Sequence, residues 1–194
     1  MIPYHFSSCG RDDIRDFIEK YHYSHNINGV ISDYCFKIND AEGLLIGGMI
    51  FGRLAMKNQW KKYVASEQEI MELRRLVCID NTPKNTESWF IGKALRYLRK
   101  YTDVKVIISY SDLSYGHTGV IYKASNFMLV GQSPANKIIL RLSDGKRYHD
   151  KTIRTTYKGK LKPFAARLKK DLEEGLAIYV KTKPKNIYLY YLKK

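Results

Sequence analysis

The chain has 194 residues, of which 44% are hydrophobic and 27% are charged, proportions typical of a globular protein with one buried core. It has no apolar run near the ~20 residues that a membrane span needs, and its start lacks the charged flank and apolar block of a signal peptide. Cys9, Cys35 and Cys78 form no CxxC pair or disulfide framework. We therefore expect a single domain, free of membranes, in a reducing cytoplasm.

The net charge of +15 is concentrated in the last third of the chain. Residues 1–136 hold 17 Lys and Arg against 14 Asp and Glu, whereas residues 137–194 hold 17 against 5. Such asymmetry is typical of a polyanion-binding surface, because each neutralised phosphate releases condensed counterions. A merely basic, solvated surface is the alternative. The basic residues alternate with aromatic ones instead of forming a tail, which favours nucleic-acid binding by 137–194.

Hydrophobic spacing predicts one helix and three strands in the first 80 residues. In chain order they are a helix over 11–23, strands over 33–38 and 44–51, a polar segment over 53–68, and a strand over 70–79. The connector NDAEG suits a hairpin between the first two strands. Gly47 and Gly48 lie inside the second strand, where glycine indicates a bulge or the close approach of a backbone or ligand.

The remaining residues predict an alternation of helices and strands. The elements are a helix over 86–101, a strand over 104–110, a short helix over 119–125, a strand over 127–131, a helix at about 164–174, and a closing hairpin formed by 175–180 and 186–192. In the first helix, Ile91, Ala94, Leu95 and Leu98 follow the i, i+3, i+4, i+7 pattern. This order favours a central mixed sheet flanked by helices.

The connector 81–88, between a strand and the helix that begins at Thr86, is a candidate anion site. A helix N-terminus leaves backbone N–H groups unpaired and carries a partial positive charge, which suits a pyrophosphate. Asn85 is a suitable N-cap and would place Ser88 in the first turn. Capping alone, without any ligand, explains these residues as well.

Two polar residues near strand ends are candidates for acid–base chemistry. Asp112 directly follows a predicted strand, where open α/β sheets place ligand crevices, and can orient or deprotonate a nucleophile. The alternative is a turn or cap residue. Tyr122 can protonate a departing thiolate, since a phenol has a pKa near 10. Its alternative is packing against Phe127.

The segment YHYSHN and the motif ELRR supply further candidates. His22 and His25 have a spacing that can ligate a metal, but no third ligand stands at a recognisable distance in the sequence. A proton carrier in a substrate-contacting loop is the preferred interpretation of His22, because histidine titrates near neutrality. Arg75 lies in a central strand, where it needs an ion pair with Glu72 or Asp112, or an anionic ligand.

The motifs ELRRL, NTES, ISYSD, GVIYKASNF and KPKNIYLYYL, taken in this order, resemble the Mom family of phage DNA-modification enzymes. That family looks like a divergent branch of the GNAT acyltransferase superfamily, and the resemblance covers about residues 15–194. It implies an α/β GNAT fold with a central mixed, mostly antiparallel twisted sheet flanked by helices, here with a basic C-terminal extension. It also implies an enzyme that binds acetyl-CoA and modifies the exocyclic amine of adenine in phage DNA, protecting it from host restriction in the host cytoplasm.

The residues that match the family's motifs are Tyr23 of the YHYSHN segment and five candidates named above: His22, Arg75, Ser88, Asp112 and Tyr122. One departure concerns the pyrophosphate loop, which is glycine-rich in ordinary GNAT enzymes, whereas residues 81–88 contain no glycine. Cofactor binding would then depend on Arg75, Ser88, Lys84, Asn85 and the helix N-terminus.

The resemblance also suggests a role for each residue. Asp112 or His22 is the expected base and Tyr122 the acid, while Tyr23 is expected to stack on an adenine that is flipped out or single-stranded. Two alternatives stay open: an N-acetyltransferase acting on RNA or a protein amine, and a nucleic-acid-binding module whose acyl-CoA site has decayed. The participation of a metal, the group finally attached and the oligomeric state are left open by the sequence.

Overall fold

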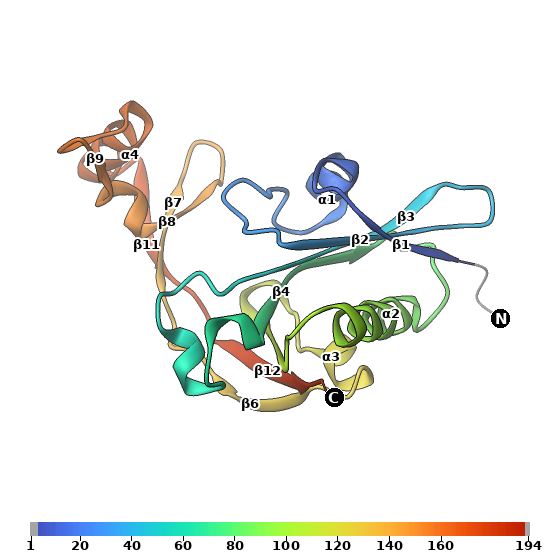
Figure 1. The fold of residues 1–194 in the computed structure, drawn as a ribbon. Helices are drawn as coiled ribbons and strands as arrows, with labels where there is room; N and C mark the ends of the chain where they lie inside the picture. Colours follow the sequence, from blue (N-terminus) through green and yellow to red (C-terminus); the bar gives the residue numbers. More distant parts are fainter. Residues whose placement is uncertain (1–3, 193–194) are drawn as a thin grey trace. The chain divides into compact units, whose positions relative to one another are not determined.

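The structure is a computed structural model that describes residues 4–192. Its main element is a seven-stranded sheet with the order β1-β2-β3-β4-β5-β12-β6 (Figure 1). The strands are β1 (His5–Cys9), β2 (Tyr34–Asn39), β3 (Leu45–Gly52), β4 (Ile70–Cys78), β5 (Val106–Asp112), β6 (Met128–Gln132) and β12 (Lys185–Tyr191). The strands β1 to β4 are antiparallel neighbours, whereas β4 and β5 are parallel.

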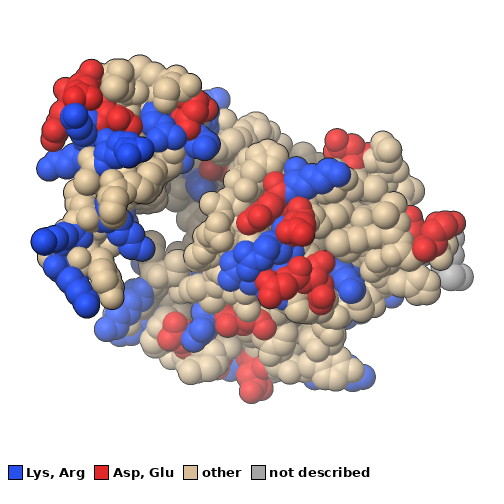
Figure 2. Space-filling view, turned by 90° about the horizontal axis from the view of Figure 1, so that it is seen from above, with Lys and Arg blue, Asp and Glu red and all other residues tan. Residues whose placement is uncertain are grey.

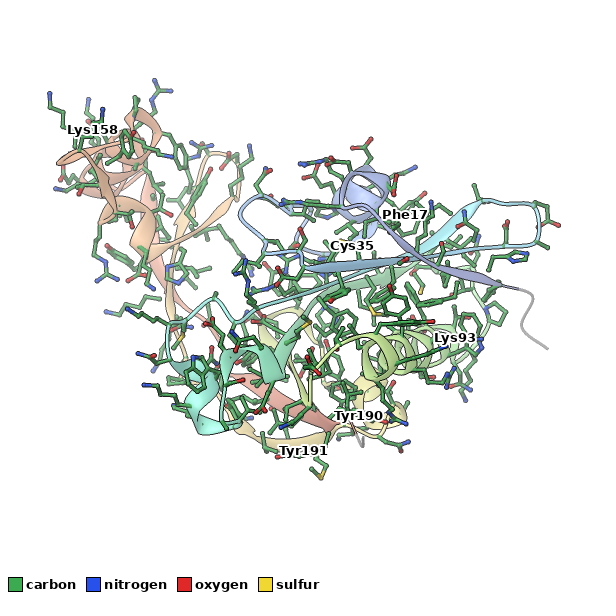
Figure 3. All side chains as sticks on the ribbon, viewed as in Figure 1. Phe17, Cys35, Lys93, Lys158, Tyr190 and Tyr191 are labelled. Carbon is green, nitrogen blue, oxygen red and sulfur yellow. The ribbon has the colours of Figure 1, made fainter. Side chains whose placement is uncertain are left out.

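Helix α1 (Arg15–Tyr21) covers one face of this sheet. Ile14 and Ile18 are fully buried there in a cluster with strand residues. Figure 3 labels Phe17 on the helix and Cys35 on the strand β2 below it. Gly48 makes the close packing possible, because a Cβ at this position would lie 3.3 Å from Ile18 and 3.4 Å from Ile14. The close approach expected at the glycine pair is therefore made by side chains of the protein itself.

Helices α2 (Thr86–Tyr101) and α3 (Val120–Ala124) lie on the opposite face (Figure 1). The apolar stripe of α2 is buried in the main core, which also holds Phe36, Phe51 and Leu73 from the strands. The helix predicted over 86–101 from its hydrophobic spacing is thus confirmed. Long amphipathic helices give the strongest periodic signal, which explains the agreement in bounds.

The chain divides into two compact units. Of the described residues, the first unit holds 4–111, 117–131 and 186–192, and the second holds 112–116 and 132–185. The second unit contains a three-stranded antiparallel sheet, a two-stranded hairpin and a helix: β7 (Lys137–Arg141), β8 (Arg147–His149), β11 (Ala177–Lys181), β9 (Thr156–Tyr157), β10 (Lys160–Leu161) and α4 (Pro163–Glu173). Its own small core is formed by Ile139, Leu168 and Ala177.

Short 3-10 helices complete the fold: Asp12–Ile14, Gln59–Lys62, Glu67–Glu69, Leu113–Tyr115 and Asp150–Ile153. Within the described residues, no helix combines the length and the apolar character needed to cross a membrane.

The predicted closing hairpin is wrong. Strand β11 pairs with β7, from Ala177 opposite Arg141 to Lys181 opposite Lys137, whereas β12 lies between β5 and β6 in the large sheet. The physical reason is burial: Ala177 belongs to the core of the second unit, while Tyr188 of β12 is fully buried in the main core. The edge strand β1 was not predicted, because its polar residues show no clear alternation.

Candidate active site

The parallel strands β4 and β5 pair over only part of their length. Their register runs from Ile70 opposite Val106 to Leu73 opposite Ser109, although β4 continues to Cys78 and β5 to Asp112. At the last pair, the Ser109 hydroxyl donates to the Leu73 carbonyl at 3.2 Å. Beyond this point the facing edges of the two strands are available to another group.

Arg75 lies on β4 just beyond the last pair. A register shift in the β3–β4 ladder places Arg75 opposite Ile50, and its side chain reaches the loop that follows α1. Nη1 donates to the Arg74 carbonyl at 2.7 Å and Nη2 to the Asn26 carbonyl at 3.3 Å. Nε is buried and has no hydrogen-bond partner among the described residues. Burial lowers the pKa of this guanidinium.

The ion-pair partners expected for Arg75 have other cationic partners. The Glu72 carboxylate lies 3.5 Å from Arg74 Nη2, and the Asp112 carboxylate lies 3.0 Å from Lys185 Nζ. Arg75 donates to the backbone carbonyls of Arg74 and Asn26, and an anionic ligand for its guanidinium stays a prediction.

His22 is buried, with 5% of its surface exposed. Burial, and then the positive charges of Arg75, His117 and His25, lower its pKa to about 3, so the ring is neutral near pH 7. The Ser24 backbone N–H donates to Nδ1 at 3.1 Å, so the neutral ring carries its proton on Nε2. In this state Nε2 is a hydrogen-bond donor. A base role for His22 would require the Ser24 bond to break first.

Tyr23 stands between two histidine rings. Its ring centroid lies 4.2 Å from that of His22 and 4.7 Å from that of His117, with interplanar angles of 32° and 46°. Tyr23 is 38% exposed, so an aromatic surface at this position is open to solvent. His117 was missed by the sequence analysis, although it lies between the two candidates Asp112 and Tyr122.

Tyr122 on α3 is buried among aromatic rings, with centroids 5.6 Å from Phe127 and 5.1 Å from Tyr188. Burial raises the pKa of its phenol to about 12, against the opposing effect of a hydrogen bond with Ser109. The packing against Phe127 that the sequence offered as an alternative is observed, the hydroxyl reaches Ser109 of β5, and the role of Tyr122 as an acid stays a prediction. The hydroxyl is therefore held, protonated, where the β4–β5 ladder ends.

Ser111 was also missed. It lies two residues beyond Ser109 on β5, and therefore on the same face of the strand. Its exposed fraction is 2%, and its Oγ has no hydrogen-bond partner among the described residues. A buried hydroxyl without a protein partner is costly, and a water, an ion or a ligand can satisfy it.

The N-terminus of α2 differs from the expectation in one respect. Asn85 occupies the N-cap position, but its backbone is left-handed with φ of 72° and its side chain makes no capping hydrogen bond. Instead, the Ser88 hydroxyl donates to the Asn85 carbonyl at 3.0 Å, and the Thr86 N–H donates to the Pro83 carbonyl at 3.2 Å. Lys84 is exposed in the turn before the helix.

Asp112 belongs to the second unit. One carboxylate oxygen accepts the Ser114 N–H at 2.9 Å and thereby caps a 3-10 helix, while the other pairs with Lys185. The cap that the sequence offered as an alternative is thus observed, and the base role stays a prediction.

In the range 4–192, no group of three or more His, Cys, Asp or Glu side chains is placed to hold a metal ion.

The parallel strands β4 and β5 separate midway along their length. Helix α2 follows β4, and the buried Tyr122 follows β5. This arrangement defines a GNAT-type acyltransferase fold. Solved structures that share this fold include two acetyltransferases. The ribosomal-protein-S5-alanine acetyltransferase from Vibrio fischeri has a TM-score of 0.54 at 7% identity, covering 100% of this chain and 96% of its own. NAA60 from Arabidopsis thaliana, in complex with acetyl-CoA, has a TM-score of 0.53 at 10% identity, covering 97% and 98%.

The chain belongs to the Mom protein family, whose defining sequence pattern matches residues 3–194. The methylcarbamoylase Mom of Escherichia phage Mu is 31% identical over 150 residues, which make up 75% of this chain. The matched part spans 59% of the phage Mu protein, so less than two thirds of that relative is represented. The resemblance that the motif order suggested is confirmed.

Proposed function

We propose that this protein transfers a group from an acyl-CoA, with acetyl-CoA as the expected donor, to the exocyclic amine of adenine in phage DNA, and so protects the DNA from host restriction. The observation that carries the proposal is the end of the β4–β5 ladder, where Arg75, Ser111 and Tyr122 all lie at or just beyond the last pair. Membership of the Mom family supports DNA as the acceptor.

The residues at this point fit an acyl-CoA. Arg75 Nε and Ser111 Oγ are buried polar atoms without a partner in the described part of the chain, and amide or phosphate oxygens of a ligand would supply one. Ser88, Lys84 and the N-terminus of α2 would hold the pyrophosphate, since a helix N-terminus attracts anions without any glycine. Bound in this way, acyl-CoA supplies an activated thioester carbonyl.

The chain's own residues then position the acceptor and move protons. An adenine amine is a poor nucleophile because its lone pair is delocalised into the ring, so positioning is required and can contribute ~7–11 kcal/mol. Tyr23, flanked by His22 and His117, offers a stacking surface for a flipped or single-stranded base. His22 Nε2 is a donor for a developing negative charge, and Tyr122 is the proton donor to the leaving thiolate. Asp112 is the candidate base.

The second unit supplies the proposed DNA surface. Its residues include 15 Lys and Arg but only 6 Asp and Glu. On the face shown in Figure 2, basic side chains outnumber acidic ones over this unit, at the left of the view. Tyr157 and Tyr179 are more than half exposed, and Lys158 lies 5.7 Å from the Tyr157 ring centroid. Exposed rings beside cations are the combination that binds unstacked bases and phosphates.

The test is incubation of the protein with acetyl-CoA and DNA, followed by mass spectrometry of the digested nucleosides. A new adenine nucleoside is expected, and it should be absent with Tyr122→Phe, which keeps the aromatic packing but lacks the hydroxyl. The phage Mu relative is named a methylcarbamoylase. That group contains a nitrogen that an acetyl group lacks, so the nucleoside mass also identifies which group is attached. Unmodified adenine under conditions where CoA binds would refute the proposal.

The acceptor can be compared directly with its rivals. Labelled acetyl-CoA offered with DNA, tRNA and a basic protein in parallel should label DNA; labelling of tRNA or protein alone would favour an ordinary N-acetyltransferase. A nucleic-acid-binding module with a decayed cofactor site would show no thermal stabilisation at high CoA concentration, because only ligand binding to the native state raises stability.

A further inference from the structure

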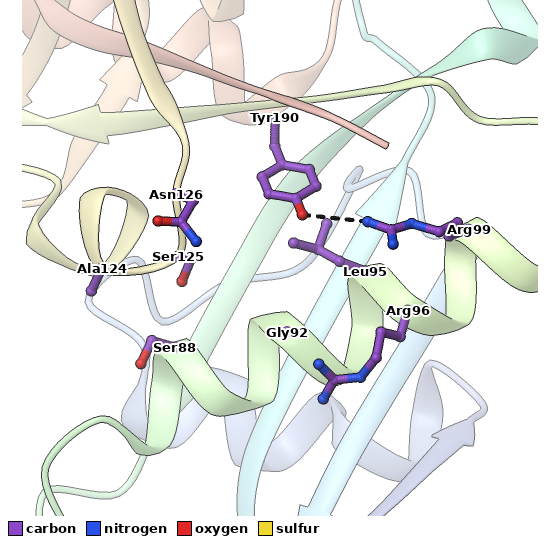
Figure 4. Close-up of a pocket in the computed structure, with 9 residues that line it drawn as sticks. All are labelled: Ser88, Gly92, Leu95, Arg96, Arg99, Ala124, Ser125, Asn126 and Tyr190. Atoms are coloured by element: carbon purple, nitrogen blue, oxygen red, sulfur yellow. Dashed lines mark hydrogen bonds between the residues drawn. The ribbon is translucent and has the colours of Figure 1, made fainter. Parts of the chain in front are cut away.

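The second unit carries a hairpin to which the proposed function gives no role of its own. A pocket of about 340 Å³ in the first unit includes Ser88 in its lining, so it belongs to the candidate cofactor site already described (Figure 4). The hairpin is the opposite kind of feature. Its strands β9 and β10 pair Tyr157 with Lys160 and Thr156 with Leu161, and every hairpin residue except Leu161 is exposed.

The strands are joined by a two-residue turn that contains an unfavourable residue. Lys158, labelled in Figure 3, and Gly159 have φ of +49° and +76°. Both values are positive, which is the type I′ geometry that matches the twist of paired strands. Asparagine or glycine is preferred at the first of these positions, and lysine is uncommon there. The lysine therefore needs a reason other than folding, and its positive charge is the property that asparagine lacks.

The hairpin presents an aromatic ring with lysines around it. Residues opposite each other in an antiparallel pair lie on the same face, so Tyr157 shares a face with Lys160, whereas the half-buried Leu161 lies on the other. Tyr157 is 66% exposed, and Lys158 Nζ lies 5.7 Å from its ring centroid. Residues 151–162 include five Lys and Arg and no Asp or Glu. The ring therefore lies on a surface that attracts phosphates.

Both ends of the hairpin are fixed to the second unit. On the N-terminal side, the Thr155 N–H donates to the Lys151 carbonyl at 2.9 Å, and Ile153 packs against the small core. On the C-terminal side, α4 begins at Pro163 and buries Leu168 in the same core. A ring on an anchored hairpin is pre-organised, so it loses little conformational freedom when it enters another molecule.

We infer that this hairpin enters duplex DNA and that the Tyr157 ring fills the base stack at the position that an adenine leaves. The inference rests on the proposed function, because an adenine in a duplex must leave the stack before its amine can be modified. A two-stranded ribbon is narrow enough for the major groove. An inserted aromatic ring stacks on the neighbouring bases in place of the lost one, and the lysines beside it neutralise phosphates.

The first test needs no cofactor. The fluorescent base 2-aminopurine replaces adenine at one position after another in a DNA duplex, and its fluorescence rises when it leaves the stack. The wild-type protein and Tyr157→Phe should both raise the fluorescence, whereas Tyr157→Ala should not. Tyr101→Ala is the matched control, because Tyr101 is 58% exposed with Lys100 Nζ 5.0 Å from its ring centroid, yet lies at the end of α2 in the first unit.

The second test separates opening of the duplex from catalysis. Tyr157→Ala should lower the modification of duplex DNA by about 5- to 100-fold, the usual effect of losing a ring that stacks on a base, while single-stranded DNA is modified at the wild-type rate. Equal losses on both substrates would overturn the inference, because Tyr157 would then be an ordinary contact. So would a wild-type protein that raises the fluorescence at no position.

Lys158→Asn separates DNA binding from folding. Asparagine suits a positive φ, so the melting temperature should stay the same or rise. The loss of one phosphate contact should weaken binding to duplex DNA and lower the slope of log affinity against log salt concentration by about 0.9. A stabilised protein with the same DNA affinity and the same slope would also overturn the inference.

Failure of this inference and failure of the proposed function give different results. If the wild-type protein modifies no DNA but raises the fluorescence in a way that depends on Tyr157, the proposed function fails and the hairpin's role in opening the duplex stands. If the wild-type protein and Tyr157→Ala modify the duplex equally well, the inference fails and the proposed function stands.

Discussion

Replacing His22 with Asn should make the protein more resistant to acid. The folded-state pKa of His22 is about 3, well below the ordinary value near 6.5, so the unfolded chain takes up this proton first as the pH falls. Stability is therefore present above pH ~6.5 and is lost as the pH falls toward 3. At 1.36 kcal/mol per pH unit, the loss between pH 7 and pH 4 is about 3 kcal/mol.

Asparagine is the informative substitution because its side-chain oxygen can accept the Ser24 N–H in place of Nδ1, yet it does not titrate. The free energy of unfolding in urea would be measured at several pH values for the wild type and for His22→Asn. Carboxylates titrate in both proteins, so the difference between the two curves isolates His22. An exposed histidine on the edge strand, replaced in His5→Gln, provides the control.

Nitrogen chemical shifts of the His22 ring test the tautomer independently. Protonated Nε2 and unprotonated Nδ1 at pH 7 are expected, since the Ser24 N–H donates to Nδ1. Parallel pH–stability curves for the wild type and His22→Asn, or a ring protonated at Nδ1, would refute the reasoning about this site.

Three further substitutions test the structure. Ser111→Ala should raise the unfolding free energy by about 1 kcal/mol, because it removes a buried hydroxyl without a partner, yet weaken acyl-CoA binding in a titration. Gly119→Ala should cost about 2–4 kcal/mol in urea unfolding, since φ is +81° and the new Cβ would lie 2.3 Å from the Tyr188 hydroxyl. Asp112→Asn should slow DNA modification ~10²–10⁴-fold if Asp112 is the base, whereas Lys185→Gln should not. Equal losses of activity in the two variants would indicate that the Asp112–Lys185 ion pair is structural.

The sequence predicted the elements better than their partners. The helix over 86–101 agreed in both bounds because its apolar residues repeat along a single element. The closing hairpin failed because two adjacent aromatic strands look alike whether or not they pair. Residues far away in the chain decided the pairing. Strand β11 pairs with β7 around Arg141, whereas Tyr188 of β12 is buried in the main core.

The candidate site shows the same division. Arg75 and Tyr122 carry large, chemically distinctive side chains, and motif order was enough to single them out. Ser111 and His117 were not found, because their significance arises only in three dimensions: Ser111 lies beyond the last pair of a parallel ladder, and His117 lies against Tyr23, 94 positions away in the chain. A periodic pattern contains no information about where a ladder ends.

The basic asymmetry of the sequence has a structural basis that composition alone does not reveal. The chain enters the second unit at the end of β5, returns at His117, enters again at the end of β6 and leaves into β12, so three of these four crossings lie at neighbouring strands of the large sheet. Hydrogen bonds tie these connections together, since the Ser133 N–H donates to the Lys185 carbonyl at 2.8 Å and the Lys183 N–H to the Ser114 hydroxyl at 3.0 Å. The basic surplus is therefore carried by a separately packed insertion with its own core, so substitutions on its surface can test the proposed DNA binding without disturbing the strands that carry Arg75 and Ser111.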